Sequence, residues 1–155
     1  MTLALDPNFY DLLAGSYSRL VGKRLVPFEH DNQNAARWLY EEAPFCVLAH
    51  STDPDPIFIY GNRTAQTCFG YSWDELTSLR SRLSAEEHNR EERQRLLDDV
   101  KRHGFATDYR GLRIAKSGRR FWIENVTVWQ LLDRGGALHG QAAVYCNWCN
   151  AANSA

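Results

Sequence analysis

Apolar residues recur at helical spacing in two segments within the first forty positions. The first segment has Asp6 as a cap and Pro7 at the first helical position, and Gly22 ends it. The second runs over about 31–42 and stops before Pro44, because the residue before a proline is pushed away from helical geometry. The pattern therefore predicts two N-terminal helices.

Five stretches are rich in apolar, β-branched and aromatic residues and have the length of strands. They span residues 45–50, 57–60, 105–115, 119–132 and 138–148. Turn-forming clusters occupy 51–56, 116–118 and 133–136. Because only short turns join the last three stretches, the pattern predicts an initial hairpin and a later antiparallel meander.

Helix-capping signals fill the region between the two groups of strands. Asn62 caps a short helix predicted over 63–69, which Gly70 ends. Ser72 and Glu75 then form a capping box, in which each side chain satisfies the backbone amide of the other residue. The chain is thus expected to form several short helices here.

A second capping box, at 84–87, predicts a longer helix that ends at about residue 103 and carries charges of both signs. Strands therefore precede and follow a block of helices. This order favours an α+β fold in which one sheet is covered on one face by helices.

Composition narrows the class of protein. A length of 155 residues fits one domain with a substantial core. The 18 basic and 19 acidic residues give a net charge of −1, without the excess of basic residues that is typical of a nucleic-acid binder. The apolar runs are too short to span a bilayer, and the N-terminus does not resemble a signal peptide. We therefore expect a cytoplasmic protein without nucleic-acid or membrane partners.

The capping region and the turns resemble those of PAS domains. Residues 62–76 follow the PAS order of Asn, short helix and Gly-Tyr-Ser-x-x-Glu-Leu. Residues 116–122 correspond to the PAS hairpin with its aromatic strand, and 133–140 correspond to the next turn. The resemblance implies a five-stranded antiparallel sheet covered by short helices on one face, with the N-terminal helices outside the core.

Seven further segments resemble the MEKHLA family, a PAS-related branch. They include Ala43-Pro44-Phe45, the run 53–58, and Gly140-Gln-Ala-Ala143. The resemblance implies a sensory or ligand-binding role without naming a ligand, because fold does not fix function. We expect a helical cap over 1–42, a PAS-like core over 43–149 and a flexible tail over 150–155.

The residues that would name a chromophore in a PAS domain are missing. No Asn-Cys-Arg-Phe-Leu-Gln run is present, and Cys68 has other neighbours, which speaks against a flavin adduct. His88 and His103 are the candidates for an axial haem ligand, but both read as surface histidines. We therefore expect neither flavin adduct nor haem, and the cofactor is left unassigned.

Four cysteines raise an alternative function. Cys146 and Cys149 form a C-x-x-C pair at the end of the last predicted strand. In PAS folds the first and last strands are antiparallel neighbours, which would bring Cys46 near this pair. Three thiols together could form a redox switch or hold a soft metal. Buried, inert cysteines are the simpler interpretation.

The strand over 119–132 supplies the candidate ligand pocket. Its alternation places one set of side chains on one face, and a second set, which includes Glu124, on the other. We expect the first set to face inward, since a buried unpaired Glu124 would be costly. The predicted pocket residues are Tyr109, Phe121, Ile123, Asn125, Thr127, Trp129 and Gln141.

The sequence contains no signature of a nucleophile with its base and no glycine-rich phosphate loop. We therefore predict a non-enzymatic PAS-like module that binds a small molecule or a signalling protein. A homodimer through the N-terminal helices is expected to accompany this role. A thiol-based sensor and a small enzyme that uses the same cavity are the alternatives.

Overall fold

The computed structural model describes residues 3–28, 31–85 and 90–151. Its helices are α1 (Pro7–Val21), α2 (Asn32–Glu41), α3 (Arg63–Phe69), α4 (Trp73–Leu76), the 3-10 turn η1 (Ser81–Ser84) and α5 (Arg90–His103). Its strands are β1 (Cys46–His50), β2 (Phe58–Gly61), β3 (Phe105–Ile114), β4 (Arg120–Leu132), β5 (Leu138–Tyr145) and β6 (Asn147–Asn150). The predicted order of elements is confirmed.

All strands pair antiparallel, in the order β2-β1-β5-β4-β3. The first and last long strands, β1 and β5, are central neighbours, with Cys46 opposite Tyr145. The predicted strand over 138–148 is divided at Cys146, because its second part, β6, moves on to pair with residues 121–124 of β4. The sheet therefore has a short sixth strand beside the five expected.

Local capping fixes the helices where the sequence predicts them. The side chain of Asp6 accepts a hydrogen bond from the amide of Asn8, and that of Asn62 accepts one from Ala65. Ser72 and Glu75 form the reciprocal capping box, with hydrogen bonds of 3.0 and 3.2 Å. These caps satisfy amides that would otherwise have no partner in the first turn.

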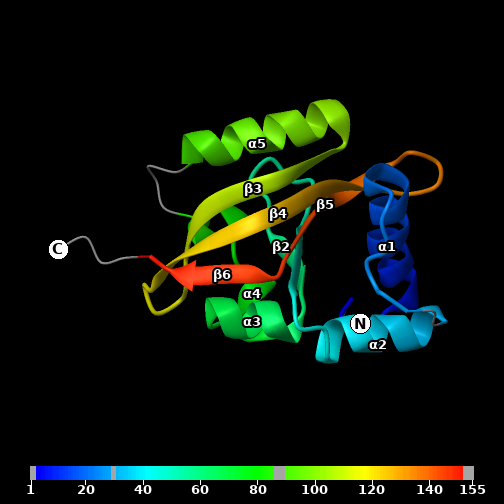
Figure 1. Cartoon of the computed structure of the whole chain (residues 1–155), viewed down its shortest axis with the longest axis horizontal. Helices are drawn as coiled ribbons and strands as arrows, with labels where there is room; N and C mark the ends of the chain where they lie inside the picture. The colour runs from blue at the N-terminus through cyan, green and yellow to red at the C-terminus, as the bar shows by residue number, and fades with distance from the viewer. Residues whose placement is uncertain (1–2, 29–30, 86–89, 152–155) are drawn as a thin grey trace.

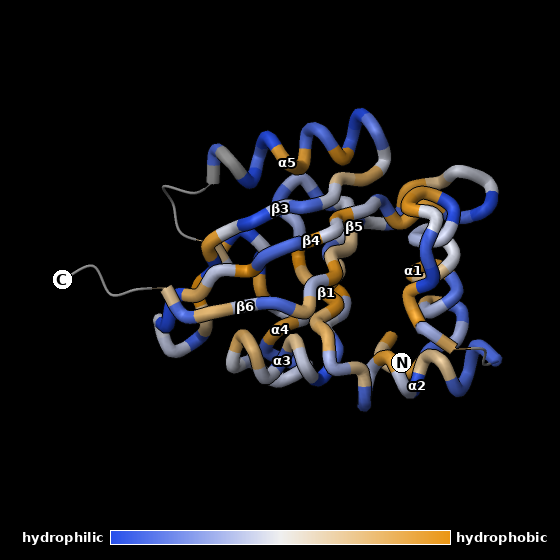
Figure 2. Tube along the Cα trace, viewed as in Figure 1, coloured by the Kyte–Doolittle hydropathy of each residue, from blue (hydrophilic) through white to orange (hydrophobic). Residues whose placement is uncertain are grey.

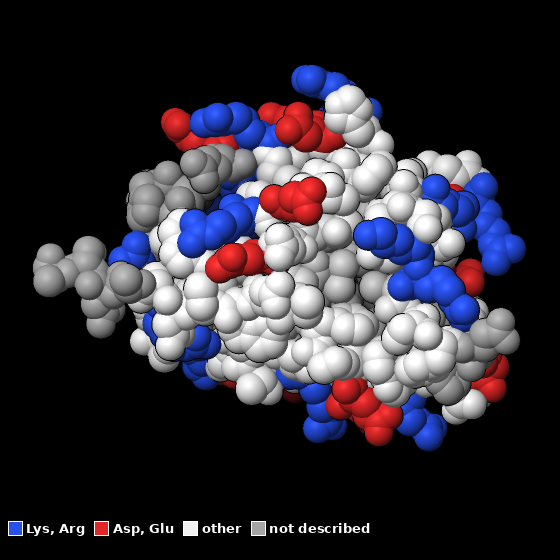
Figure 3. Space-filling model, viewed as in Figure 1, with Lys and Arg blue, Asp and Glu red and all other residues white. Residues whose placement is uncertain are grey.

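At Ser84, the first residue of the capping box predicted over 84–87, the structure differs from the prediction. Ser84 is the last residue of η1, and its hydroxyl donates to the carbonyl of Ser81 at 2.7 Å. Glu86 and Glu87 lie outside the described residues. α5 is described from Arg90 onward, and its exposed surface carries charges of both signs (Figure 3).

Two buried clusters lie on the two faces of the sheet. The inner cluster packs α3, α4 and α5 against side chains such as Leu48, Phe121 and Val128. The outer cluster packs α1 and α2 against side chains such as Val47 and Trp129. Figure 1 shows α1 and α2 together at the end of the sheet away from the C-terminus, and Figure 2 shows the hydrophilic character of most of α5.

The N-terminal helices thus lie outside the helix-covered core and close the opposite face of the sheet. Leu13 and Leu39 are each 1% exposed in the outer cluster. The division of the chain into a cap, a core and a tail stays a prediction, and residues 152–155 of the expected tail lie outside the described residues. In the part of the chain that the structure describes, no helix has the length and apolar character needed to cross a membrane.

A β-bulge in the middle of β4 changes which side chains face inward. Asn125 has a φ of 53°, a left-handed conformation that interrupts the alternation of side chains along a strand. Phe121 and Ile123 before it, and Val126 and Val128 after it, all belong to the inner cluster. The expectation that residues 121, 123, 125, 127 and 129 share one face is therefore wrong beyond Ile123.

Candidate ligand-binding site

A cavity of about 70 Å³ lies between the inner face of the sheet and the segments η1 and α5. Its apolar wall is formed by Leu48, Phe58, Phe69, Leu96, Leu97, Ile123, Val126, Val128, Ala142 and Ala143. Side chains with polar atoms come from His50, Ser84, Arg93, Tyr109, Arg113, Gln141 and Tyr145. An apolar wall with a few polar groups is the composition typical of a small-molecule site.

Three of the predicted pocket residues, Tyr109, Ile123 and Gln141, line this cavity. Phe121 is fully buried beside it, with its ring 5.1 Å from that of Phe69.

The other three predicted residues lie elsewhere. Asn125 is exposed at the bulge, and neither it nor Thr127 is part of the wall. Trp129 belongs to the outer cluster, where its ring lies 4.7 Å from that of Tyr17 in α1. The bulge explains all three positions, because residues of β4 beyond it point to the opposite face from the one that strict alternation predicts. A ligand contact by any of the seven residues stays a prediction.

Sequence reasoning missed Arg113, which is 8% exposed and lines the cavity. Its guanidinium donates to the hydroxyl of Tyr109 at 3.2 Å and to the carbonyl of Leu112 at 3.0 Å. The guanidinium carbon lies 5.5 Å from the centre of the Tyr109 ring. Alternation along β3 could have found this residue, because Tyr109, Gly111 and Arg113 stand two apart.

His50, at the end of β1, is the second polar group that the sequence did not assign to the cavity. Its Nδ1 lies 3.0 Å from the carbonyl oxygen of Ser51, which accepts a hydrogen bond when Nδ1 carries the proton. The Nε2 atom is buried and has no hydrogen-bond partner within residues 3–28, 31–85 and 90–151. Burial lowers the pKa of His50, and the charge of Arg93 lowers it further. The imidazole is therefore neutral at pH 7, with an acceptor at Nε2.

The cavity adjoins a wider surface groove, of about 410 Å³, between the β1–β2 loop and α5. His50, Arg93, Leu97 and Gln141 line both spaces. These shared residues mark the route by which a molecule would enter from solvent.

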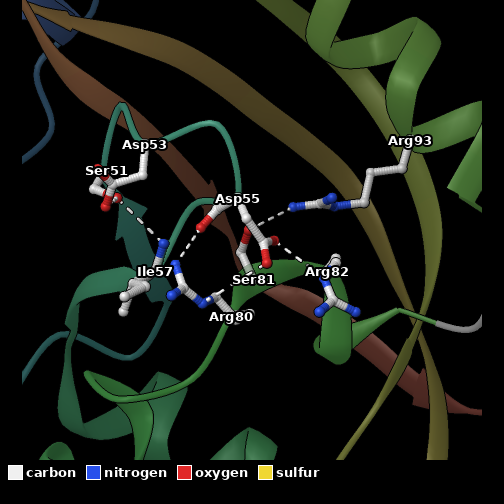
Figure 4. A network of polar contacts seen from close by, with 8 residues as sticks. All are labelled: Ser51, Asp53, Asp55, Ile57, Arg80, Ser81, Arg82 and Arg93. Atoms are coloured by element: carbon white, nitrogen blue, oxygen red, sulfur yellow. Dashed lines mark hydrogen bonds and ion pairs between the residues drawn. The ribbon is translucent and has the colours of Figure 1, made fainter.

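A polar network closes one side of this entrance (Figure 4). The Asp55 carboxylate accepts a hydrogen bond from Arg82 at 3.0 Å, and its backbone carbonyl accepts one from Arg80 at 2.6 Å. Arg93 of α5 reaches the Ser81 hydroxyl of η1 at 2.9 Å. The β1–β2 loop, η1 and α5 are thus joined by charge-assisted hydrogen bonds at the mouth of the cavity.

The cysteines divide into a buried and an exposed pair, so the interpretation as buried thiols holds for Cys46 and Cys68 only. Cys46 is buried in the inner cluster with Cys68 and Tyr145, and the Cys68 thiol lies 3.7 Å from the Tyr145 hydroxyl. A hydrogen bond with Cys68, together with burial, raises the pKa of Cys46. Cys146 and Cys149 are exposed.

The three thiols of the alternative function, Cys46, Cys146 and Cys149, are therefore split between the core and the surface, because the Cys46 side chain turns inward. Among the residues that the structure describes, no three His, Cys, Asp or Glu side chains are grouped closely enough to hold a metal ion.

The family model of the MEKHLA domain matches residues 8–150 of the chain. The chain belongs to the MEKHLA domain family. The matched range covers α2 and all of α1 except its first residue, so the family model extends over both N-terminal helices. No curated protein sequence matches this MEKHLA domain.

Solved structures place the MEKHLA fold among PAS domains. The PAS domain of a Colwellia psychrerythraea protein is similar at 14% identity and a TM-score of 0.63, covering 76% of this chain and 94% of that one. A light-oxygen-voltage domain studied with a flavin analogue is 18% identical, with a TM-score of 0.56 and coverage of 70% and 78%. The Rhodobacter sphaeroides LOV protein is 12% identical, with a TM-score of 0.59 and coverage of 76% and 65%.

The cavity of this MEKHLA domain does not fit the flavin named for one of these neighbours. Its volume of about 70 Å³ is less than half of the roughly 150 Å³ that accommodates benzene in an engineered protein cavity. The three fused rings of a flavin are larger still. His103, one of the two candidate haem ligands, is exposed at the end of α5, and His88 lies outside the described residues.

Proposed function

We propose that this MEKHLA domain is a cytoplasmic sensory module that binds a small molecule in the cavity beneath α5 and signals by non-covalent contact. The observation that carries the proposal is the cavity itself, which has an apolar wall and is lined by the buried Arg113 and by His50. The buried Nε2 of His50 has no hydrogen-bond partner among the described residues. Groups of this kind are costly to leave in a packed core and become favourable when a ligand satisfies them. The proposal assigns the domain no catalytic step.

The structure offers a short route from the cavity to the N-terminal helices. Val128 lines the cavity, and the next residue, Trp129, packs against Tyr17 of α1 on the opposite face of the sheet. A shift of β4 on ligand binding would therefore also move Trp129 and change its contact with Tyr17 of α1. We propose that α1 and α2 present the signal to a partner protein, or to a second copy of the chain in a homodimer.

Fragment screening by thermal shift, together with native mass spectrometry of the purified domain, tests this function. The wild type is compared with Ala143→Phe, which fills the cavity, and with Ala137→Phe, a control in the exposed turn before β5. We expect small molecules that stabilise the wild type and Ala137→Phe but have no effect on Ala143→Phe. Binding that survives in Ala143→Phe would show that the cavity is not the site, and a library with no stabilising molecule would contradict the function.

A further inference from the structure

Two free thiols and a tyrosine hydroxyl meet in the inner cluster, at Cys46, Cys68 and Tyr145. Cys68 belongs to α3, whereas Cys46 and Tyr145 lie opposite each other on β1 and β5. The Cys68 thiol lies 3.7 Å from the Tyr145 hydroxyl and shares a hydrogen bond with the Cys46 thiol. The packing of α3 on the sheet thus brings a second cysteine against Cys68 inside the core.

The surroundings of Cys68 favour its thiolate form. The hydrogen bond from Cys46 lowers the pKa of the Cys68 thiol, although burial raises it. The Tyr145 hydroxyl and the positive charge of Arg119 lower this pKa further. Arg119 is held at α3 because its guanidinium donates to the backbone carbonyl of Cys68 at 2.6 Å. The hydrogen bond between the thiols raises the pKa of Cys46, so Cys68 is the nucleophile of the pair and Cys46 keeps its proton.

The cavity gives a very small molecule a route to this sulfur. Gln141, Ala143 and Tyr145, which alternate along β5, all line the cavity, and Gln141 also lines the surface groove. The cavity therefore follows β5 from the groove to Tyr145, whose hydroxyl contacts Cys68. Its volume of about 70 Å³ corresponds to the liquid volume of roughly two water molecules. Hydrogen peroxide fits this space, whereas a maleimide is too large for it.

We propose that hydrogen peroxide oxidises Cys68 and that the product is a Cys46–Cys68 disulfide. The Cys68 thiolate attacks one peroxide oxygen, the O–O bond breaks, and a sulfenic acid forms on Cys68 while the departing hydroxide takes up a proton and becomes water. The Cys46 sulfur then attacks the Cys68 sulfur, the S–O bond breaks, and the hydroxyl group leaves with the Cys46 proton as a second water. Two thiols are thereby oxidised to one disulfide, and one peroxide is reduced to two molecules of water.

The disulfide ties α3 to β1 and alters the wall of the cavity. A disulfide bond is shorter than the hydrogen-bonded contact that it replaces, so α3 moves toward β1. Phe69 follows Cys68 in α3 and lines the cavity, with its ring 5.1 Å from that of Phe121. Oxidation therefore moves a wall residue of the ligand site. The modification itself is separate from the proposed ligand binding, which requires no change of redox state.

The test exposes the reduced full chain to hydrogen peroxide for the time that oxidises free cysteine completely at the same pH. The wild type is compared with a double variant, Cys146→Ser with Cys149→Ser, which keeps only the buried thiols. After catalase has removed the peroxide, the protein is alkylated in urea and analysed by mass spectrometry. We expect the double variant to lose two hydrogen atoms and both alkylation sites, and the wild type to yield a linked peptide of Cys46 and Cys68.

Two single substitutions in the double variant assign the roles. Cys46→Ala removes the resolving thiol, so we expect Cys68 to gain one oxygen atom as a sulfenic acid, trapped with dimedone during unfolding. Cys68→Ala removes the nucleophile, so Cys46 should stay reduced over the same time. Oxidation of Cys46 in Cys68→Ala as fast as that of Cys68 in Cys46→Ala would overturn the assignment of the nucleophile.

The peptide analysis of the wild type needs no substitution, so the inference stays testable if a core variant does not fold. A wild type in which both buried thiols are still alkylated in urea after peroxide treatment would overturn the inference. A disulfide between Cys146 and Cys149 alone would overturn it as well. Neither result bears on the proposed ligand binding, which is measured on the reduced protein.

Discussion

The indole Nε1 of Trp129 donates a hydrogen bond to the hydroxyl of Ser16, 3.1 Å away, and thereby joins the sheet to α1. Ser16 is fully buried, and its hydroxyl in turn donates to the carbonyl of Leu12 at 2.5 Å. A polar relay of this kind, inside the apolar outer cluster, fixes the orientation of α1 more narrowly than apolar packing alone. The helix proposed to carry the signal is thus attached to the strand that borders the cavity.

Removal of the Ser16 hydroxyl should destabilise the domain modestly. Trp129 Nε1 also lies 3.3 Å from the carbonyl of Leu13, so Ser16→Ala leaves the indole with a weaker acceptor. We expect a loss of about 1 kcal/mol in the free energy of unfolding, measured with urea. Ser18→Ala, at an exposed position of the same helix, is the control and should change nothing measurable. Equal stability of the two variants would contradict the relay.

Asn62 should be among the least replaceable residues of the chain. It is fully buried, its oxygen accepts from the amides of Val47 and Ala65 at 3.1 Å, and its nitrogen donates to the carbonyls of Leu39 and Phe45 at 3.0 and 2.9 Å. All four hydrogen-bonding positions of the amide are used. The side chain therefore fastens α2, β1 and α3 to one another.

Asn62→Ala leaves four buried backbone groups without this partner, and we expect a loss of about 3 kcal/mol or more in the free energy of unfolding. Asn34→Ala, in the exposed first turn of α2, is the matched control. Urea unfolding of both variants measures the difference. A cost for Asn62→Ala as small as that for Asn34→Ala would show that water replaces the amide at this site.

Local signals made the fold predictable. The caps at Asn62 and Ser72 and the turns of the meander are encoded by neighbouring residues, and the structure has them where the sequence predicts them. The cavity depends instead on which face each strand residue takes. One left-handed residue, Asn125, exchanges these faces. Asparagine adopts this conformation more readily than most residues, but a single asparagine in a strand does not by itself predict a bulge.

The missed polar residues illustrate the same limit. Once Tyr109 is placed inward, alternation leads to Arg113, but the cost of burying an unpaired charge argues against placing an arginine there. The space above Gly111 that accommodates the guanidinium is visible only in three dimensions. In the same way, the contact between the free thiols of Cys46 and Cys68 depends on how α3 packs on β1. The positions of the cysteines along the sequence do not indicate this packing.

The four thiols should differ in reactivity. Cys146 and Cys149 are exposed and should react with a maleimide in the folded protein, whereas Cys46 and Cys68 are buried and should react only after unfolding. Mass spectrometry of labelled protein, with and without urea, counts each class. Rapid labelling of all four thiols in the folded state would contradict the burial of the Cys46 and Cys68 pair.

Glu124 should slow the reaction of Cys149. The thiol donates to the Glu124 carboxylate at 3.3 Å, and this hydrogen bond raises the pKa of Cys149 because it favours the protonated form. Glu124→Gln removes the charge, so the pKa should fall and the labelling rate at pH 8 should rise. The rate of Cys146, measured in a Cys149→Ser background with and without Glu124→Gln, is the control and should not change. An unchanged rate for Cys149 would show that the carboxylate does not hold its proton.

His50 should make the domain less stable as the pH falls. Burial lowers the pKa of His50 in the folded state below the ordinary value of 6.5, so the unfolded chain binds the proton more readily. The stabilisation is therefore complete above about pH 6.5 and is lost below it, by up to about 1.4 kcal/mol per pH unit. His50→Gln keeps a neutral polar side chain and should flatten this part of the pH profile of urea unfolding. His103→Gln, at an exposed histidine of α5, should leave the profile steep. Equal slopes for wild type and His50→Gln would mean that burial does not lower the pKa of His50 in the folded state.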